Sequence, residues 1–255
     1  MNKLKIWLAR YRALVERCST PGIMPPNFPR LSFLFRLIAR TWVWLQVGRV
    51  KVSGKENLLA GQSDRIILCP NHSSYFDALV VFATVPYTAR YMAAYDQFQG
   101  LGGLRALVMA ASGAFPVDRS KGGDVIGISI SALTAEHALV IFPEGKINSD
   151  GSLSIFKTGP FRIAMGVRES LLDSNTVYVV PMQICYAVRH QASAQGGYGR
   201  MGLKWRHGVH VNVGQPIDIK ELAALTPAEA SSLFRQRVID IAPCPTLPDT
   251  TSQAA

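Results

Sequence analysis

The sequence predicts an α/β fold, with a central mostly parallel or mixed sheet flanked by helices and an N-terminal amphipathic segment of two helices before it. From about residue 49 onward, short apolar runs that are typical of buried strands alternate with longer segments of helical periodicity. At 255 residues, 48% of them hydrophobic, the chain is long enough for one large domain with a substantial core. We expect the N-terminal segment at 1–47, the main domain at 48–242, and a disordered tail rich in Pro and Thr at 243–255.

The strands are expected where short apolar stretches lie between turn-forming residues. These stretches are residues 50–52, 66–69, 90–94, 114–117, 139–142, 177–186 and 209–213. Helical patterns fall between them, at 77–85, about 97–111, 122–137 and 159–172. The run Thr226-Pro227-Ala228-Glu229 is a capping box with proline at the first helical position, so a last helix should run to about Ile241.

The N-terminal segment combines apolar periodicity with positive charge. Apolar residues recur at steps of three and four over residues 4–18, which predicts one face of an amphipathic helix. A group of prolines follows, and then a second apolar stretch at 31–47, interrupted by Arg36 and Arg40. Residues 1–51 contain ten Lys and Arg against a single acid, whereas the rest of the chain has seventeen bases and sixteen acids. The net charge of +10 is therefore concentrated near the N-terminus.

This charge distribution predicts contact with an anionic membrane surface through helices that lie in its interface. Each Lys or Arg near an anionic leaflet contributes about 1 kcal/mol, and each buried Leu, Trp or Tyr contributes roughly 1.5–3 kcal/mol. The two arginines within 31–47 argue against a spanning helix, so we expect a peripheral or monotopic protein. The alternative is a pair of helices packed on the core with basic faces toward solvent. Nucleic acid is not expected as a partner, because the residues between the bases are mostly aliphatic or Trp and no nucleic-acid-binding motif occurs.

The cysteines and the N-terminus indicate the cytoplasmic face of the membrane. Cys18, Cys69, Cys185 and Cys244 are widely spaced and form no Cys-x-x-Cys pair, which predicts reduced thiols with no disulfide framework and no metal site. The first residues do not form a secretory signal, because only four apolar residues separate the early lysines from Arg10.

The most informative motif is Asn71-His72-Ser73-Ser74-Tyr75-Phe76-Asp77, directly after the expected strand at 66–69. A neutral imidazole can take a proton from a hydroxyl, and a carboxylate on its other nitrogen fixes the tautomer and stabilises the imidazolium. On a continuous helix, side chains five positions apart would point about 140° apart. The pair therefore requires a turn, which the two serines favour. The spacing alone also fits a purely structural hydrogen bond.

Three further motifs place polar residues at the ends of expected strands. Gly113-Ala114-Phe115-Pro116-Val117-Asp118-Arg119 ends in a cation that suits a phosphate oxyanion, although Arg119 could instead pair with Asp118 or Asp124 on the surface. Ile141-Phe142-Pro143-Glu144-Gly145-Lys146 ends in a carboxylate, and its glycine permits a turn. Phe156-Lys157-Thr158-Gly159 adds a second basic position before a helix, and Val179-Val180-Pro181 closes a strand.

Taken in this order, the motifs resemble those of the glycerolipid acyltransferases, typified by bacterial 1-acylglycerol-3-phosphate acyltransferase. The resemblance covers about residues 49–215, so 48–242 would be the acyltransferase domain. It implies that His72 is the catalytic general base and that Asp77 orients it. It also implies that Arg119 contacts the phosphate of the acceptor and that an apolar groove holds the acyl chain. The remaining residues that it implicates are Glu144 and Gly145, which would shape the acceptor pocket, and Lys157 and Pro181 in secondary roles.

One departure from the family pattern concerns the acceptor. Family members that act on lysophosphatidate typically have Phe-Pro-Glu-Gly-Thr-Arg, whereas this chain has Lys146 and Ile147 at the last two positions. Either Lys146 or Lys157 would then supply the missing positive charge, as a point charge in place of a bidentate fork. The departure leaves a different acceptor open, such as another lyso-phospholipid or an amino-acid-based lyso-lipid.

The expected reaction moves a fatty acyl group from acyl-CoA or acyl-carrier protein, as co-substrate, to the hydroxyl of a lyso-lipid. The first candidate acceptor is 1-acylglycerol-3-phosphate, esterified at the sn-2 position to give phosphatidic acid, and no other cofactor is expected. A non-catalytic lipid-binding protein of the same fold is the remaining alternative. The complete set of His72, Asp77 and Glu144 argues against it.

Overall fold

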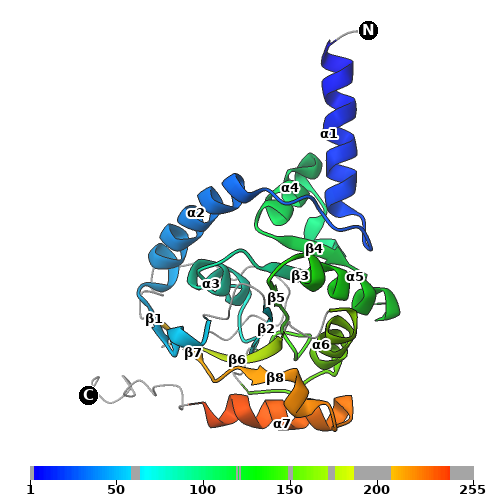
Figure 1. The fold of residues 1–255 in the computed structure, drawn as a ribbon. Coiled ribbons are helices and arrows are strands. Elements are labelled where there is room, and N and C mark those ends of the chain that lie inside the picture. The colour runs from blue at the N-terminus through cyan, green and yellow to red at the C-terminus, as the bar shows by residue number, and fades with distance from the viewer. Residues whose placement is uncertain are drawn as a thin grey trace, which may run out of the picture.

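A computed structural model describes residues 3–58, 64–118, 120, 122–148, 152–171, 176–186 and 208–241. Within these residues the strands form one eight-stranded mixed sheet in the order β1-β7-β6-β2-β5-β3-β4, with β8 paired to β6 (Figure 1). The pairs β6–β7 and β6–β8 are antiparallel, and the other neighbours are parallel. The strands are β1 (Val50–Ser53), β2 (Arg65–Pro70), β3 (Arg90–Ala94), β4 (Ala114–Val117), β5 (Ala138–Val140), β6 (Val177–Tyr186), β7 (Val209–Val213) and β8 (Ile217–Asp218). The predicted α/β class with a mixed sheet is confirmed.

The helices fall where the sequence pattern places them, with one exception between residues 95 and 111. The α-helices are α1 (Lys3–Ser19), α2 (Pro29–Val47), α3 (Asp77–Thr84), α4 (Leu104–Ala111), α5 (Gly122–Ala135), α6 (Gly159–Ser170) and α7 (Pro227–Asp240). The short 3₁₀ helices are η1 (Lys55–Leu58), η2 (Tyr95–Phe98), η3 (Leu101–Gly103) and η5 (Ile219–Leu222). The single helix expected at about 97–111 is thus divided into η2, η3 and α4. At the start of α7, Thr226 and Glu229 form the predicted capping box.

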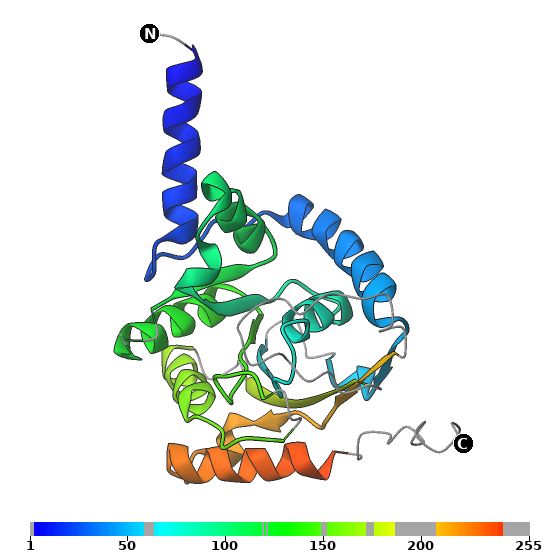
Figure 2. The ribbon, with the colours of Figure 1, turned by 180° about the vertical axis from the view of Figure 1, so that it is seen from behind.

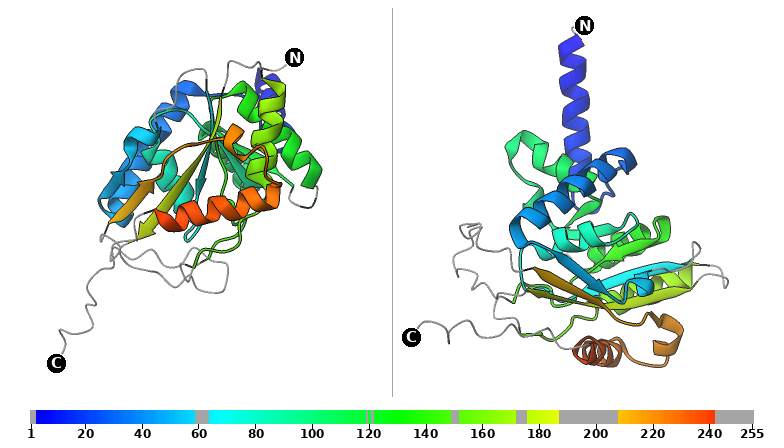
Figure 3. Two further views of the ribbon diagram at one scale, coloured as in Figure 1. Left: turned by 60° about the horizontal axis from the view of Figure 1, so that its bottom comes forward. Right: turned by 90° about the vertical axis from the view of Figure 1, so that its left-hand side faces the viewer.

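The sheet has a hydrophobic layer on each face. Ile66 and Leu68 of β2 belong to a buried cluster that includes residues of α2, α3 and α4. Ile67 and Cys69 point the other way, into a cluster formed with α5, α6 and α7. Figures 2 and 3 show these two groups of helices on opposite sides of the sheet. Because β2 is covered on both faces, its sequence is a continuous apolar run with no alternation.

Two arginines of α2, the half-buried Arg36 and the exposed Arg40, donate hydrogen bonds to backbone carbonyl oxygens at the end of α3. The guanidinium of Arg36 donates to the carbonyl oxygens of Val85 at 2.5 Å and Tyr87 at 2.7 Å. Nε of Arg40 donates to the carbonyl oxygen of Ala83 at 2.9 Å. These carbonyls lie at and just beyond the C-terminal end of α3, where positive charge is favoured by the helix dipole. Both side chains therefore fasten α3 to α2.

The described cysteines differ in their redox state. Cys18 and Cys69 are buried free thiols, and burial raises the pKa of each of them above its ordinary value. Cys185 is disulfide-bonded, so the expectation of no disulfide is wrong at this residue. Sequence spacing could not show it, because disulfides depend on proximity in space. No helix in the described ranges has both the length and the apolar character that crossing a bilayer requires. The tail at 243–255 lies outside the described residues.

Candidate active site

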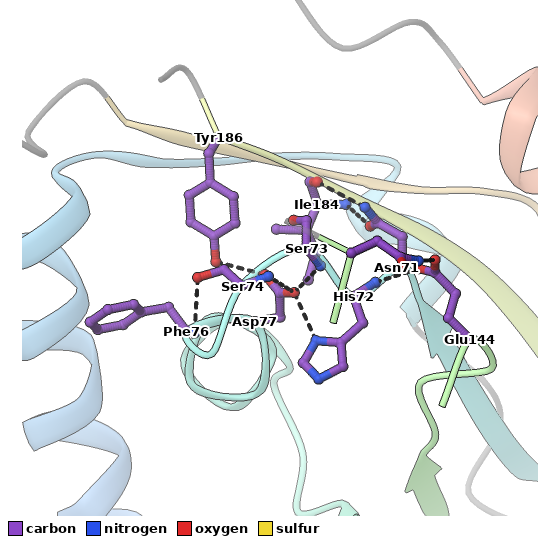
Figure 4. A network of polar contacts seen from close by, with 10 residues as sticks. Asn71, His72, Ser73, Ser74, Phe76, Asp77, Glu144, Ile184 and Tyr186 are labelled. Atoms are coloured by element: carbon purple, nitrogen blue, oxygen red, sulfur yellow. Dashed lines mark hydrogen bonds and ion pairs between the residues drawn. The ribbon is translucent and has the colours of Figure 1, made fainter. Parts of the chain in front are cut away.

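The His–Asp pair lies at the carboxyl edge of the parallel part of the sheet. His72 follows the end of β2, and Asp77 is the first residue of α3. The chain turns between them, and Nδ1 of His72 lies 2.9 Å from Oδ2 of Asp77 (Figure 4). Because β2, β5 and β6 run parallel, the residues that follow β2 and β5 and the last residue of β6 meet at the same edge. The turn that the pair required is therefore present.

The carboxylate of Asp77 is fully buried and accepts four hydrogen bonds. Besides His72, Oδ2 accepts from the backbone N–H groups of Ser73 at 2.6 Å and Ser74 at 2.8 Å, while Oδ1 accepts from the hydroxyl of Tyr186 at 2.7 Å. The two backbone N–H groups can only donate, which suits an ionised carboxylate at a helix N-terminus. Since such a carboxylate can only accept, the hydrogen of the imidazole is on Nδ1 and the lone pair is on Nε2.

The imidazole of His72 is held on one side and open on another. Its ring stacks on Phe142, with centroids 4.1 Å apart and planes 24° apart. Its side chain is 19% exposed, and Nε2 points away from Asp77 (Figure 4). Among the described residues, no hydrogen-bond partner occupies Nε2. This arrangement presents a proton acceptor in a fixed orientation at a partly open surface.

Glu144 holds the backbone of His72 in place. It is only 3% exposed, and its Oε1 accepts from the backbone N–H of His72 at 2.7 Å. Oε2 accepts from the backbone N–H of Ser154 at 2.9 Å and from the side-chain amide of Asn148. The backbone N–H of Asn148 in turn donates to the carbonyl oxygen of His72 at 2.8 Å. The loop after β5 is therefore fastened to His72 from both sides.

Gly145 and the two lysines form the next part of the site. The φ angle of Gly145 is +67°, a conformation that favours glycine. A Cβ atom at this position would lie 2.7 Å from both Cε and Nζ of Lys157. The side chain of Lys157 therefore lies directly over the glycine, and the residue as a whole is exposed. Lys146 is also exposed, so two cations flank the turn that carries Glu144.

Helix α7 supports the loop that carries Lys157. The guanidinium of Arg235 donates to the carbonyl oxygens of Ser154 at 3.0 Å and Leu153 at 2.7 Å. The hydroxyl of Ser231 donates to the carbonyl oxygen of Lys157 at 3.0 Å. The position of this loop relative to Glu144 thus depends on a helix far along the sequence.

One of the expected site residues lies outside the described residues, and another lies within the sheet. Arg119 lies outside the described residues, directly after β4 and Asp118; beyond it, the N–H and hydroxyl of Ser120 both donate to Asp118. Pro181 is buried within β6, where it pairs in register with Cys69 of β2. Pro181 is therefore part of the sheet that supports the site.

Sequence reasoning missed the contributions of Tyr186 and Asn71. The pKa of Tyr186 is raised well above its ordinary value, first by burial and then by the negative charge of Asp77, so its hydroxyl stays protonated as a donor. The side chain of Asn71 bonds both backbone groups of Ile184, which continues the pairing of β2 and β6 beyond Pro70. The sequence did contain a signal for Tyr186, because this residue ends an expected strand at the same edge of the sheet as His72.

A hydrogen-bonded His–Asp pair at the carboxyl edge of a largely parallel sheet, beside exposed lysines, defines a class of α/β proteins equipped to activate a hydroxyl group. The family model described as Acyltransferase matches residues 49–185, which is more than half of the chain. The protein therefore belongs to the Acyltransferase family, and the resemblance to glycerolipid acyltransferases is confirmed.

Named relatives agree with this membership. The chain is 28% identical over 121 residues to 1-acyl-sn-glycerol-3-phosphate acyltransferase alpha of Homo sapiens and, equally, of Bos taurus. The match takes in 46% of this chain and 41% of those proteins, so the chain spans about two fifths of their length. The crystal structure of the 1-acyl-sn-glycerophosphate (LPA) acyltransferase PlsC from Thermotoga maritima shares the fold. It has a TM-score of 0.56 and 21% identity, and the match covers 82% of this chain and 75% of that one.

Proposed function

We propose that the protein transfers a fatty acyl group from acyl-CoA or acyl-carrier protein to the hydroxyl of a lyso-lipid. The first candidate acceptor is 1-acylglycerol-3-phosphate, with phosphatidic acid as product. The observation that carries the proposal is the 2.9 Å contact between His72 and Asp77, with Nε2 directed away from the carboxylate. Family membership and the names of the curated relatives support the acceptor class.

In the proposed reaction, Nε2 of His72 takes the proton of the acceptor hydroxyl while the oxygen attacks the thioester carbonyl. The carbon–sulfur bond then breaks, and the imidazolium returns the proton to the leaving thiolate. Asp77 stabilises the imidazolium throughout. General-base assistance of this kind contributes roughly 10²–10⁴ in rate, and alignment of the two substrates contributes at least about as much. No covalent intermediate with the enzyme is needed.

The acceptor phosphate would be held by Lys146, Lys157 and Arg119. Both lysines are exposed beside the turn that carries Glu144, which supports their part in the proposal. An ammonium is a compact point charge, so it imposes less geometric selection on the phosphate than a guanidinium does. The replacement of the usual Thr-Arg by Lys146-Ile147 therefore favours, as a second candidate, a lyso-lipid with a different head group.

We further propose that the N-terminal helices attach the enzyme to the cytoplasmic face of a membrane, where its acceptor resides. The guanidinium of Arg36 turns inward to the carbonyl oxygens of Val85 and Tyr87, while Arg30 and Arg40 are exposed on α2. Large apolar side chains of α2 that are exposed are Leu31, Phe33, Leu34, Leu37, Ile38, Trp42, Trp44 and Leu45. Tryptophan at this density is typical of interfacial helices. Helix α1, which projects from the body (Figure 1), adds five basic residues against one acidic residue.

The proposal is tested by a purified-enzyme assay that crosses both thioester donors with a panel of lyso-lipids. We expect transfer to lysophosphatidate, and its loss in His72→Ala with folding and vesicle binding retained. His137→Ala is the matched control, because His137 is exposed near the opposite end of β2. Near-normal turnover in His72→Ala would refute the mechanism. Absence of transfer with every pair of substrates would favour the non-catalytic lipid-binding protein.

A further inference from the structure

A corner of the main domain exposes apolar side chains, and one of these residues has an unusual backbone conformation. Leu101 in η3 is 77% exposed and has a φ angle of +50°, the one positive value for a residue other than glycine in the described part of the chain. L side chains rarely adopt this conformation. Leu104 and Val108 follow on one face of α4 and are 54% and 39% exposed. We call Leu101, Leu104 and Val108 the α4 corner.

Helix α1 is fastened directly to the α4 corner. The hydroxyl of Tyr11 donates to the carbonyl oxygen of Gly102 at 2.9 Å. A Cβ atom at Gly103 would lie 2.4 Å from a methyl group of Val15, so the helix packs against bare backbone there. The corner and α1 therefore form one continuous surface, although they are far apart in the sequence (Figure 1).

Only half of the apolar stripe of α1 is used in this packing. Its C-terminal half, with Val15 and the fully buried Cys18, contacts the body of the protein. In its N-terminal half, Trp7 is 58% and Leu8 is 38% exposed. Figures 1 and 3 show that this half extends beyond α4, away from the sheet. The exposed part of the stripe thus continues the apolar surface of the α4 corner.

The charges around this surface select its partner. The N-terminal half of α1 carries Lys3, Lys5, Arg10 and Arg12 and no acidic residue. Basic groups beside exposed leucine and tryptophan match the boundary of an anionic bilayer, where the apolar groups enter and the cations stay with the head groups.

We infer that the α4 corner inserts into the surface of an anionic bilayer together with the N-terminal half of α1. Membrane contact would then include the main domain itself, in addition to the N-terminal helices. A membrane contact on the main domain, in addition to those on the N-terminal helices, defines the orientation of the domain relative to the bilayer. The inference rests on the proposed function, because it assumes that the acceptor is presented by a membrane.

The test compares full-length variants for binding to vesicles of phosphatidylcholine and phosphatidylglycerol. Leu101→Glu/Leu104→Glu changes two exposed side chains of the corner. Leu233→Glu/Ile239→Glu is the matched control, because both residues are exposed on α7 at the other end of the molecule (Figure 1). We expect the corner variant to lose roughly tenfold or more in vesicle affinity, since the transfer of two leucines into lipid is lost, and the control to stay within about twofold of wild type.

Three outcomes would overturn the inference: wild-type affinity in the corner variant, an equal loss in both variants, or a change in oligomeric state of the corner variant with vesicle binding unchanged. The last result would assign the surface to a second copy of the chain. Acyl transfer to a short-chain acceptor kept below its micellar concentration separates this test from the proposed function. The corner variant should retain this acyl transfer in solution. If the wild-type protein itself shows no transfer, the proposed function is refuted, while the vesicle-binding result still applies.

Discussion

The substitution Glu144→Gln tests whether this residue positions His72 or contacts the acceptor. Three hydrogen-bond donors point at the carboxylate: the N–H groups of His72 and Ser154 and the amide of Asn148. Glutamine has nearly the same shape but replaces one acceptor oxygen by a donor group. In either orientation of the new amide, at least one buried N–H faces another donor. Each such loss costs about 1–3 kcal/mol, which corresponds to a fall in Tm of roughly 2–12 °C for a domain of this size.

The kinetic consequence follows from the same contact. If the backbone of His72 shifts, Nε2 is misplaced relative to the acceptor hydroxyl, and a displacement near 1 Å lowers the rate by about a hundredfold. We expect kcat to fall by roughly ten- to a hundredfold, with the KM for the acceptor within about twofold of wild type, because the carboxylate of Glu144 is buried and bonded to backbone N–H groups. Steady-state assays with varied acceptor and thermal unfolding provide both measurements. Glu221→Gln, at an exposed position, controls for the loss of one charge. An unchanged kcat and Tm with a raised KM would show that Glu144 contacts the acceptor, contrary to this reasoning.

Three further substitutions probe other contacts of the site and its support. Tyr186→Phe removes one hydrogen-bond donor from Asp77 and should lower kcat by about tenfold. Because the pKa of Tyr186 lies well above its ordinary value, the alkaline limb of the pH–rate profile should stay where it is in the wild type. A shift of that limb would contradict the role of Tyr186 as a donor to Asp77. Gly145→Ala introduces strain at φ +67° and displaces Lys157, so we expect a loss of stability of about 1 kcal/mol and a raised KM for a phosphate-bearing acceptor; an unchanged KM would separate Lys157 from the acceptor. Arg36→Gln should destabilise the fold by about 1.5–3 kcal/mol in chemical denaturation without weakening vesicle binding, because its half-buried guanidinium bonds the carbonyl oxygens of Val85 and Tyr87; weaker vesicle binding would instead indicate contact with lipid.

The fold could be predicted largely from local patterns. The strands at 90–94, 114–117, 177–186 and 209–213 have the predicted bounds, because apolar runs between turn-forming residues mark their ends. The expected strand at 139–142 ends earlier, at residue 140, since Phe142 leaves the sheet to stack on His72. An apolar residue that belongs to a site looks the same in sequence as one that continues a strand.

The helix expected at about 97–111 shows a second limit. Gly100, Gly102 and Gly103 all have positive φ angles, which end regular helix in that stretch. Glycine in a helical pattern indicates reduced helix propensity, but it does not show whether the backbone turns.

The residue types of the candidate site could be predicted from the sequence, but only some of the hydrogen bonds between them could. The pairing of His72 with Asp77 follows from local sequence, because a turn is enough to bring them together. The contacts of Glu144 with His72 and of Tyr186 with Asp77 join residues 72 and 109 positions apart. Such contacts depend on strand order in the sheet, which residue spacing does not encode.

The support that α7 gives to the loop at 153–157 bears on which part of the chain is needed to hold the site together. The family match stops at residue 185, yet Ser231 and Arg235 hold the loop whose N–H group bonds Glu144. Strand β7, also beyond the match, lies between β1 and β6 in the sheet. A fragment cut at the borders of sequence similarity would retain the reactive side chains and lose the scaffold that aligns them. The part of the chain that is similar to the family is thus shorter than the part that is needed to hold the site in place.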